Sequence, residues 1–312
     1  MEQDKDKLSI DVARLYYKSD YSQQQIAGEL GISRPTVSRL LQYAKEQGFV
    51  KIQIADPVDN MSELEEKLSK NYGLQEVRIA YSPLNTYEEI KKHIGAKAGE
   101  YLYEVVQDGD IIGVSWGTTM YSVATQLKPK AVKGAQIVQL KGGVSHSESK
   151  TYADEIVERF AAAFATIARY LPLPVIFDTP QIKQMVDQDR HIRRIIELGR
   201  QANIAIFTVG TVKDDALLFR LGYIGTADKE KLQRNGVGDI CSRFFDATGT
   251  LCNQEIDSRT VGIRLDELKN KERSILVAGG ARKIEAIKAA LAGSYANVLI
   301  TDQYTARELC QR

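Results

Sequence analysis

From Val77 onward, short runs rich in β-branched residues alternate with longer runs of helical periodicity. The alternation is typical of a parallel sheet covered by helices on both faces, because parallel strands need long crossover connections. This part of the chain therefore predicts an α/β fold with a Rossmann-like parallel sheet. We expect strands at 77–81, 110–115, 135–140, 174–177, 203–210, 273–279 and 297–301, with helices at 88–106, 118–127, 151–169, 181–200 and 282–292.

Residues 21–44 have the layout of a helix-turn-helix. Ser22 is a suitable N-cap for a first helix, and Gly31 can end that helix in a tight turn. Ser33 is a second N-cap, and Pro35 stands in the first turn of the next helix, where its missing N–H costs nothing. The apolar residues fall at spacings that let two helices cross over one small core: Ile26, Ala27, Leu30, Ile32, Val37, Leu40 and Leu41.

The exposed face of the second predicted helix is rich in hydrogen-bond donors and lacks acidic residues. Such side chains can contact phosphates and read base edges in the major groove of double-stranded DNA. Arg34, Thr36 and Arg39 are the predicted base-reading residues. The alternative is an ordinary helical hairpin with a solvated polar face, but the two caps and the glycine turn favour DNA binding. The predicted DNA-binding set is Ser33, Arg34, Thr36, Ser38, Arg39 and Gln42.

The organisation of the chain follows from these two patterns. Residues 7–19 read as a helix that supports the DNA-binding pair, residues 49–56 as a short strand or wing, and residues 62–71 as a helix between the domains. We therefore expect a helix-turn-helix DNA-binding domain at 1–55 and an effector-binding, oligomerising domain at 56–312. Because the formal net charge is only +1, any positive field that attracts DNA must be local.

Several function classes are disfavoured by composition. The three cysteines are dispersed and no Cys/His ligand spacing occurs, so we predict neither a disulfide framework nor a metal site, and no cofactor. The N-terminus is charged and no uncharged run approaches the length of a membrane span. We expect a cytoplasmic protein that does not bind membranes.

Four predicted strand ends carry glycine or hydroxyl residues, at 115–119, 141–143, 209–211 and 278–280. In open α/β sheets ligands bind beyond the carboxyl ends of the strands, so the four loops predict a single site. Gly117, Thr118 and Thr119 offer backbone N–H groups and hydroxyls to an anion, and Lys283 could reach the same phosphate. The alternative for each loop is that glycine only turns the chain and that the lysine is solvated.

The segments GVSWGTT, QLKGG, FTVGT, GDICSRFFD and ILVAGG follow the helix-turn-helix YSQQQIAGELGISRPTVSRLL in this order, and the whole chain thereby resembles the SorC family of bacterial transcriptional regulators. The resemblance implies an effector domain akin to sugar-phosphate isomerases and deaminases, a phosphorylated sugar as effector, and homo-oligomers, dimers or tetramers, on palindromic operators. It is strongest to the branch that controls deoxyribonucleoside catabolism, which implies a repressor released by deoxyribose 5-phosphate. It also implies that Gly117, Thr118, Thr119 and Lys283 hold the phosphate and that Asp239 faces the sugar.

Lys141 follows an apolar strand and precedes two glycines, so its amine should be partly desolvated and neutral. A neutral amine can form an imine with the aldehyde of an open-chain sugar; the alternative is a noncovalent hydrogen bond or ion pair.

The rival function is catalysis by a sugar-phosphate isomerase or aldolase using Lys141 and Asp239, although His93, His146 and His191 are too scattered to suggest a catalytic cluster. We expect that the protein is not an enzyme. The predicted effector-binding set is Lys141, Gly117, Thr118, Thr119, Gly142, Gly143, Asp239, Gly279, Gly280 and Lys283.

Overall fold

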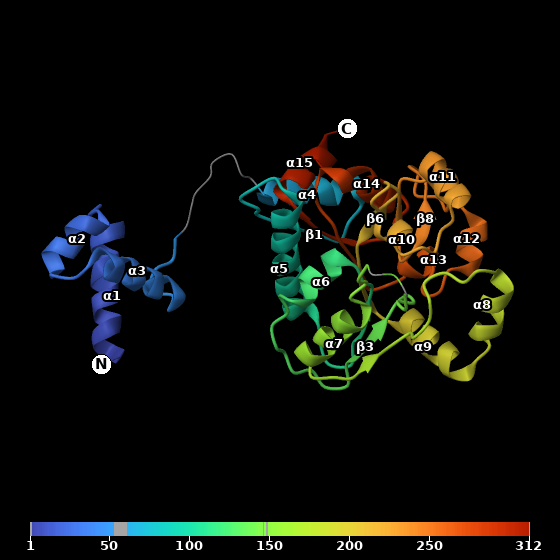
Figure 1. Ribbon diagram of the computed structural model, residues 1–312, viewed down its shortest axis with the longest axis horizontal. Helices are drawn as coiled ribbons and strands as arrows, with labels where there is room; N and C mark the ends of the chain where they lie inside the picture. Colours follow the sequence, from blue (N-terminus) through green and yellow to red (C-terminus); the bar gives the residue numbers. More distant parts are fainter. Residues whose placement is uncertain (1, 53–60, 146, 148, 312) are drawn as a thin grey trace. The chain divides into compact units, whose positions relative to one another are not determined.

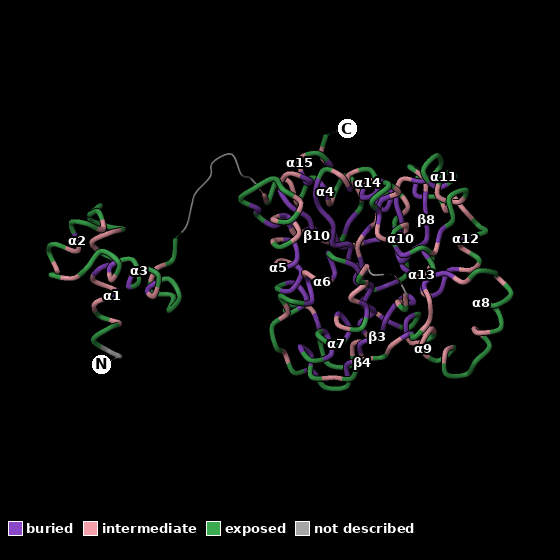
Figure 2. Tube along the Cα trace, viewed as in Figure 1, coloured by how far each residue is buried: buried purple, intermediate pink, exposed green. Residues whose placement is uncertain are grey.

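The computed structural model describes residues 2–52, 61–145, 147 and 149–311. The chain divides into two compact units, Met1–Asp59 and Asn60–Arg312. Each unit has a hydrophobic core of its own, so each is described separately (Figures 1 and 2).

The first unit contains the helices α1 (Glu2–Tyr17), α2 (Gln23–Leu30) and α3 (Arg34–Glu46). Both predicted caps form: the Ser22 hydroxyl accepts from the Gln25 N–H in a capping box, and the Ser33 hydroxyl accepts from the Thr36 N–H. Gly31 adopts the left-handed conformation, with φ 63°, which ends α2. The helices enclose a small core of Val12, Ala13, Ile26, Val37, Leu40, Leu41 and Ala44.

The second unit is built on a seven-stranded sheet whose strand pairs are all parallel, which confirms the predicted α/β fold (Figure 1). Its strands in spatial order are β1 (Glu76–Ala80), β10 (Val298–Asp302), β9 (Arg273–Val277), β5 (Ile204–Phe207), β2 (Ile111–Val114), β3 (Gln136–Gln139) and β4 (Ala168–Arg169). The chain moves outward in one direction from β2 to β4 and in the other from β5 to β10. The order therefore reverses between β2 and β5, where open α/β sheets commonly bind ligands.

Helices cover both faces of this sheet because successive residues of each strand point to opposite sides. On one face Ile204 and Ile206 pack in a cluster with α5 (Tyr87–Val105), α6 (Thr118–Ala124) and α7 (Ala153–Ala163). On the other, Ala205 and Phe207 pack in a cluster with α4 (Met61–Tyr72), α14 (Ile284–Ala292) and α15 (Gln303–Cys310). The buried strands between these layers are purple in Figure 2.

A second sheet, of three antiparallel strands, follows β5 and was not expected from the sequence. Its strands are β6 (Val209–Thr211), β7 (Gly238–Ile240) and β8 (Arg243–Phe245). The remaining elements are α8 (Pro180–Asp187), α9 (Arg190–Gln201), α10 (Leu217–Arg220), α11 (Thr226–Asn235), α12 (Gln254–Arg259), α13 (Leu265–Leu268) and the 3-10 helix η1 (Ala281–Lys283).

Several expected elements differ from the structure. Residues 174–177 form no strand; Pro174 and Ile176 make only single bridges, and the strand that lies next to β3 at this edge of the sheet is β4. The helix expected at 151–169 ends at Ala163 because Ala165 has a φ of 51°. The run 203–210 divides at Thr208 between β5 and β6.

Two further corrections concern helix boundaries and the expected wing. The run 181–200 forms two helices because the Asp189 carboxylate accepts from the His191 and Ile192 N–H groups and starts a new one. Of the wing at 49–56, residues 49–52 form no strand, and the rest lies outside the described residues, as does His146.

Candidate functional sites

A cavity of about 360 Å³ lies beyond the carboxyl ends of β9, β5, β2 and β3, four adjacent strands of the parallel sheet. The loop after each of these strands supplies part of its wall: Lys283 follows β9, Thr208 follows β5, Thr119 follows β2 and Lys141 follows β3. Two of these loops, those after β2 and β5, flank the point where the strand order reverses. The volume is in the range of small-molecule sites.

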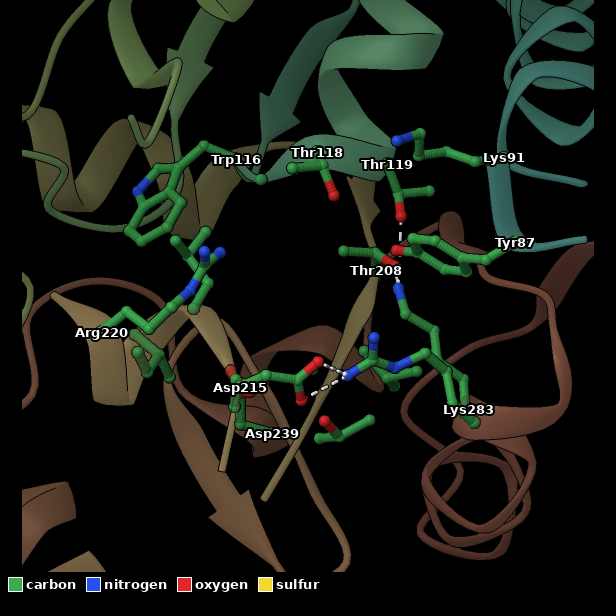
Figure 3. Close-up of a pocket in the computed structure, with 18 of the residues that line it drawn as sticks. Tyr87, Lys91, Trp116, Thr118, Thr119, Thr208, Asp215, Arg220, Asp239 and Lys283 are labelled. Carbon is green, nitrogen blue, oxygen red and sulfur yellow. Dashed lines mark hydrogen bonds and ion pairs between the residues drawn. The ribbon is translucent and has the colours of Figure 1, made fainter. Parts of the chain in front are cut away.

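One wall of the cavity is cationic and rich in hydroxyls (Figure 3). The Lys283 ammonium donates to the hydroxyls of Thr119, at 3.2 Å, and Thr208, at 3.1 Å. The Tyr87 hydroxyl, contributed by the start of α5, hydrogen-bonds to Thr118 and Thr119. These donors converge on one region, so they form a candidate anion subsite.

Burial of Tyr87 acts to raise the pKa of its phenol. The charge of Lys283 and the hydrogen bonds from the hydroxyls of Thr118 and Thr119 act in the opposite direction, and the net pKa lies below the usual value. An oxygen in this region is therefore stabilised in its anionic form.

The other end of the cavity holds a buried lysine against an indole ring. The Lys141 ammonium lies 3.6 Å from the centroid of the Trp116 ring and donates to the Ser242 hydroxyl over 3.3 Å. Trp116 is itself fixed, because its indole N–H donates to the Gly142 carbonyl over 2.7 Å. Trp116 lies across the cavity from Tyr87 and Lys283 (Figure 3). The cavity therefore has an amine at one end and an anion subsite at the other.

Asp239 lies in β7 and is placed by an unusual hairpin. The connection from β7 to β8 is Cys241–Ser242, and both residues have positive φ, 51° and 68°. Such a two-residue turn normally contains glycine or asparagine, so Cys241 and Ser242 adopt a backbone conformation that is unfavourable for their residue types. The Asp239 carboxylate accepts from the Ser242 N–H over 2.9 Å, which fixes the carboxylate and the hydroxyl that contacts Lys141.

Burial changes the ionisation of both groups. It lowers the pKa of the Lys141 ammonium, and the nearby carboxylate of Asp239 only partly offsets this. It raises the pKa of the Asp239 carboxyl, partly offset by Lys141, the Ser242 N–H and Lys283. Burial also raises the pKa of the Cys241 thiol to about 11. Lys141 therefore has a larger neutral fraction than an exposed lysine, which makes its amine a better nucleophile.

An ion pair lies at the rim of the cavity. The Arg282 guanidinium contacts both oxygens of Asp215, at 2.6 and 2.8 Å, and holds the pKa of that carboxyl below its usual value. Lys91, whose ammonium is 2.6 Å from Glu88, and the exposed Arg220 complete the charged lining.

The structure brings six of the predicted effector-binding residues to the cavity: Gly117, Thr118, Thr119, Lys141, Asp239 and Lys283. The four predicted glycines Gly142, Gly143, Gly279 and Gly280 are not among its lining residues, and at the first three an added Cβ would overlap neighbouring atoms. A side chain at Gly142 would meet the carbonyls of Leu173 and Pro174, and one at Gly143 would meet Ala153 and Gln139.

Other lining residues were absent from the predicted set: Tyr87, Lys91, Trp116, Thr208, Gly210, Asp215, Arg220 and Arg282. Gly210 is required sterically, because a Cβ there would overlap the Asp239 carboxylate. Trp116 and Gly210 stood inside strand-end loops that the sequence analysis singled out. Tyr87 and Lys91 follow the first strand at a distance, and no local signal in the sequence marks them.

The predicted DNA-binding residues lie on α3 and at its N-cap. Ser33, Arg34, Ser38, Arg39 and Gln42 are exposed, and Thr36 is half-buried. The hydroxyls of Ser33 and Thr36 hydrogen-bond to each other over 2.8 Å. Gln42 donates to Glu46 over 2.9 Å, and the Nε of Arg39 donates to the Pro35 carbonyl over 3.4 Å, so both side chains are partly engaged within the helix.

Fold and cavity together define a class: a regulator with a helix-turn-helix unit and an α/β unit that binds a small molecule. Family comparisons agree. The sugar-binding domain model Sugar-bind matches residues 56–311, and the homeodomain-like model HTH_23 matches residues 4–51.

Individual relatives extend the similarity over the whole chain. The deoxyribonucleoside regulator of Bacillus subtilis (strain 168) is 58% identical over 309 residues, which cover 99% of each chain. The sorbitol operon regulator of Klebsiella pneumoniae is 33% identical and covers 97% of each. The crystal structure of the full-length sorbitol operon regulator SorC from Klebsiella pneumoniae superposes with a TM-score of 0.79 at 30% identity, covering 98% of each chain.

The chain is thus a transcriptional regulator with a sugar-binding domain, and it belongs to the SorC family. Its relatives are regulators rather than enzymes, so the alternative of catalysis by Lys141 and Asp239 is set aside. Among the described residues, no helix combines the length and apolar character needed to cross a membrane.

Proposed function

We propose that this protein represses genes of deoxyribonucleoside catabolism and is released from its operator by deoxyribose 5-phosphate. The observation that carries the proposal is the arrangement of the cavity, which holds a buried lysine amine at one end and a cationic, hydroxyl-rich wall at the other. The 58% identity to a relative named deoxyribonucleoside regulator supports this choice of sugar and genes.

The phosphate of the effector is assigned to the wall formed by Lys283, Thr118, Thr119 and Thr208. Lys283 supplies a charge, the hydroxyls supply donors, and Gly117 lets the backbone come close to the ligand. These donors contact one another and Tyr87, so a phosphate exchanges hydrogen bonds rather than meeting unpaired groups.

The aldehyde of the open-chain sugar is assigned to Lys141. The neutral amine attacks the carbonyl carbon and forms a carbinolamine. Loss of water then breaks the C–O bond and leaves a C=N bond to the lysine nitrogen. Asp239 and Ser242 are close enough to this end to exchange protons with the intermediate. The captured sugar is not turned over, and hydrolysis of the imine returns it.

Regulation follows from linkage between the two sites. If operator binding by α3 and sugar binding favour different arrangements of a homo-oligomer, each ligand weakens the other by the same free energy, typically about 1–3 kcal/mol. Two recognition helices must lie roughly 34–36 Å apart, or a multiple of this, to reach successive major grooves. A small rotation between subunits therefore suffices for release.

Borohydride trapping tests the covalent step on the full chain. Incubation with deoxyribose 5-phosphate and reduction should add one reduced sugar phosphate to Lys141, detected by mass spectrometry. Lys271 is the matched control, because it is also buried with a lowered pKa but does not line the cavity. It should remain unmodified. An adduct that survives Lys141→Ala would place the imine on another amine and rule out Lys141, and no adduct would leave only noncovalent binding.

A thermal-shift screen of sugar phosphates tests the identity of the effector. The true effector should raise the melting temperature of the full chain by mass action, and deoxyribose 5-phosphate should raise it more than ribose 5-phosphate or free deoxyribose. Equal shifts with all three compounds would contradict the assignment of the sugar.

A further inference from the structure

The turn at Gly279 and Gly280, which precedes the short helix η1 that carries Lys283, does not line the cavity, although it sets the position of the lysine backbone. Gly280 has a φ of 90° and caps η1, and the Lys283 N–H donates to the Gly280 carbonyl over 2.9 Å. Lys283 itself is only 6% exposed, and its ammonium makes the two hydroxyl contacts of the anion subsite. The position of this ammonium therefore depends on the geometry of the turn.

Two residues at the start of α15 hold this turn from behind. The Gly280 N–H donates to the Thr305 hydroxyl over 2.8 Å. The Thr305 hydroxyl in turn donates to the Asp302 carboxylate over 2.6 Å, so a single hydroxyl joins the turn to the end of β10. Thr305 is 1% exposed and Asp302 fully buried. Water cannot replace these bonds without entering the core.

Asp302 is fixed by further contacts of its own. Its other oxygen accepts from the N–H groups of Tyr304 and Thr305 and caps α15. A Cβ at Gly279 would overlap the Asp302 carboxylate, so the backbone of the turn lies directly against this carboxylate. Glycine at 279 is therefore explained by contact with Asp302 rather than by contact with a ligand.

From these contacts we infer that Thr305, held by Asp302, is a positioning residue for the phosphate-binding Lys283. The inference rests on the proposed function in one respect only, that a phosphate binds at Lys283. A lysine side chain has four rotatable bonds, so its ammonium is well placed only when the backbone that carries it is fixed. Thr305 acts through the Gly280 turn and does not touch the ligand.

The first test compares Thr305→Val, which keeps the shape but removes the hydroxyl, with Thr305→Ser, which keeps the hydroxyl. Calorimetric titration of the full chain with deoxyribose 5-phosphate should show that Thr305→Val lowers the affinity for the sugar phosphate by about tenfold or more. The affinity of Thr305→Ser should stay within about threefold of that of the unmodified protein. In a Lys283→Met background, Thr305→Val should cause little further loss, because the two changes act through one ammonium.

The second test needs no sugar. Brief acetylation of the full chain followed by peptide mapping should label Lys283 at least about fivefold faster in Thr305→Val than in the unmodified protein, because its ammonium is no longer held among the hydroxyls. Lys271, equally buried but distant from the turn, is the internal control for the fold and should label at an unchanged rate.

The outcomes separate the inference from the proposed function. Faster labelling of Lys283 alone, without sugar binding by any form of the protein, would support the positioning role and contradict the effector assignment. Unchanged labelling of Lys283 in Thr305→Val, or full additivity of Thr305→Val and Lys283→Met in binding, would overturn the positioning role. Equally fast labelling of Lys271 would show general loosening of the fold and would also overturn it.

Discussion

The ammonium of Lys141 lies 3.6 Å from the centroid of the Trp116 ring, and Trp116 is the single tryptophan of the chain. The ring is held by the Gly142 carbonyl, so its position relative to the lysine is fixed from both sides. A cation over an aromatic face is attracted by the ring, and a change in the charge or position of that cation alters the surroundings of the indole. The intrinsic fluorescence of the protein is therefore a direct report on Lys141.

We expect deoxyribose 5-phosphate to change the tryptophan fluorescence in a saturable manner, because imine formation converts the amine next to the Trp116 ring into a substituted C=N group. Lys141→Met should abolish the change while preserving the emission of a buried indole. A titration at fixed protein concentration measures this. A saturable change of full size in Lys141→Met would show that Lys141 is not the responding group.

The rate of sugar capture should depend on pH in a manner set by Lys141. Burial lowers the pKa of this lysine, and only the neutral amine attacks a carbonyl. The rate should rise with pH until the lowered pKa is passed and be constant above it, whereas capture by an exposed lysine would continue to rise to about pH 10.4. Borohydride trapping at a series of pH values measures the profile, and a rise that continues to the pKa of an exposed lysine would contradict the burial argument.

Gly210→Ala should destabilise the effector domain, because the new methyl group overlaps the Asp239 carboxylate. Forcing an extra carbon into a packed site typically costs about 1–3 kcal/mol. Gly225→Ala is the matched control, since Gly225 has nothing within 4 Å of an added Cβ and a φ of −70°. Gly225→Ala should change the free energy of unfolding by no more than about 0.5 kcal/mol. Urea unfolding of both variants gives the comparison, and equal costs would contradict the packing assigned to Asp239.

The two binding functions should be separable by substitution. Arg39→Ala removes an exposed guanidinium from α3 and should weaken DNA binding without changing sugar affinity. Thr118→Ala removes a hydroxyl from the anion subsite and should weaken sugar binding by roughly tenfold while leaving DNA binding intact. Gel-shift titrations with and without the sugar phosphate distinguish them. If both variants behaved as the unmodified protein, the division of labour would be wrong.

Much of the fold could be predicted because each local signal agrees with the tertiary structure. The caps at Ser22 and Ser33 and the turn at Gly31 appear as the sequence indicates, since capping depends on neighbouring residues alone. Strands β2, β3, β9 and β10 could be predicted from apolar runs bounded by turn residues. Residues 174–177 were misassigned because an apolar run signals burial, and nothing local shows whether a neighbouring strand will pair with it.

The candidate site could be predicted only in part, for a related reason. Lys141 and Thr118 follow strands directly, so the rule that parallel strands end at one edge of a sheet places them together. Tyr87 reaches the same cavity from the start of α5, and the pairing of Arg282 with Asp215 joins residues 67 positions apart. Such contacts depend on the packing of helices and loops, which the sequence does not state.

The most direct test of the central claim is fluorescence anisotropy of a labelled DNA duplex, selected by the full-length protein from a random library, during titration with deoxyribose 5-phosphate. We expect the sugar phosphate to release the duplex from the unmodified protein but not from Lys141→Met, which still binds DNA. Duplex that stays bound at saturating sugar phosphate, or release of the Lys141→Met complex at the same concentrations, would contradict it.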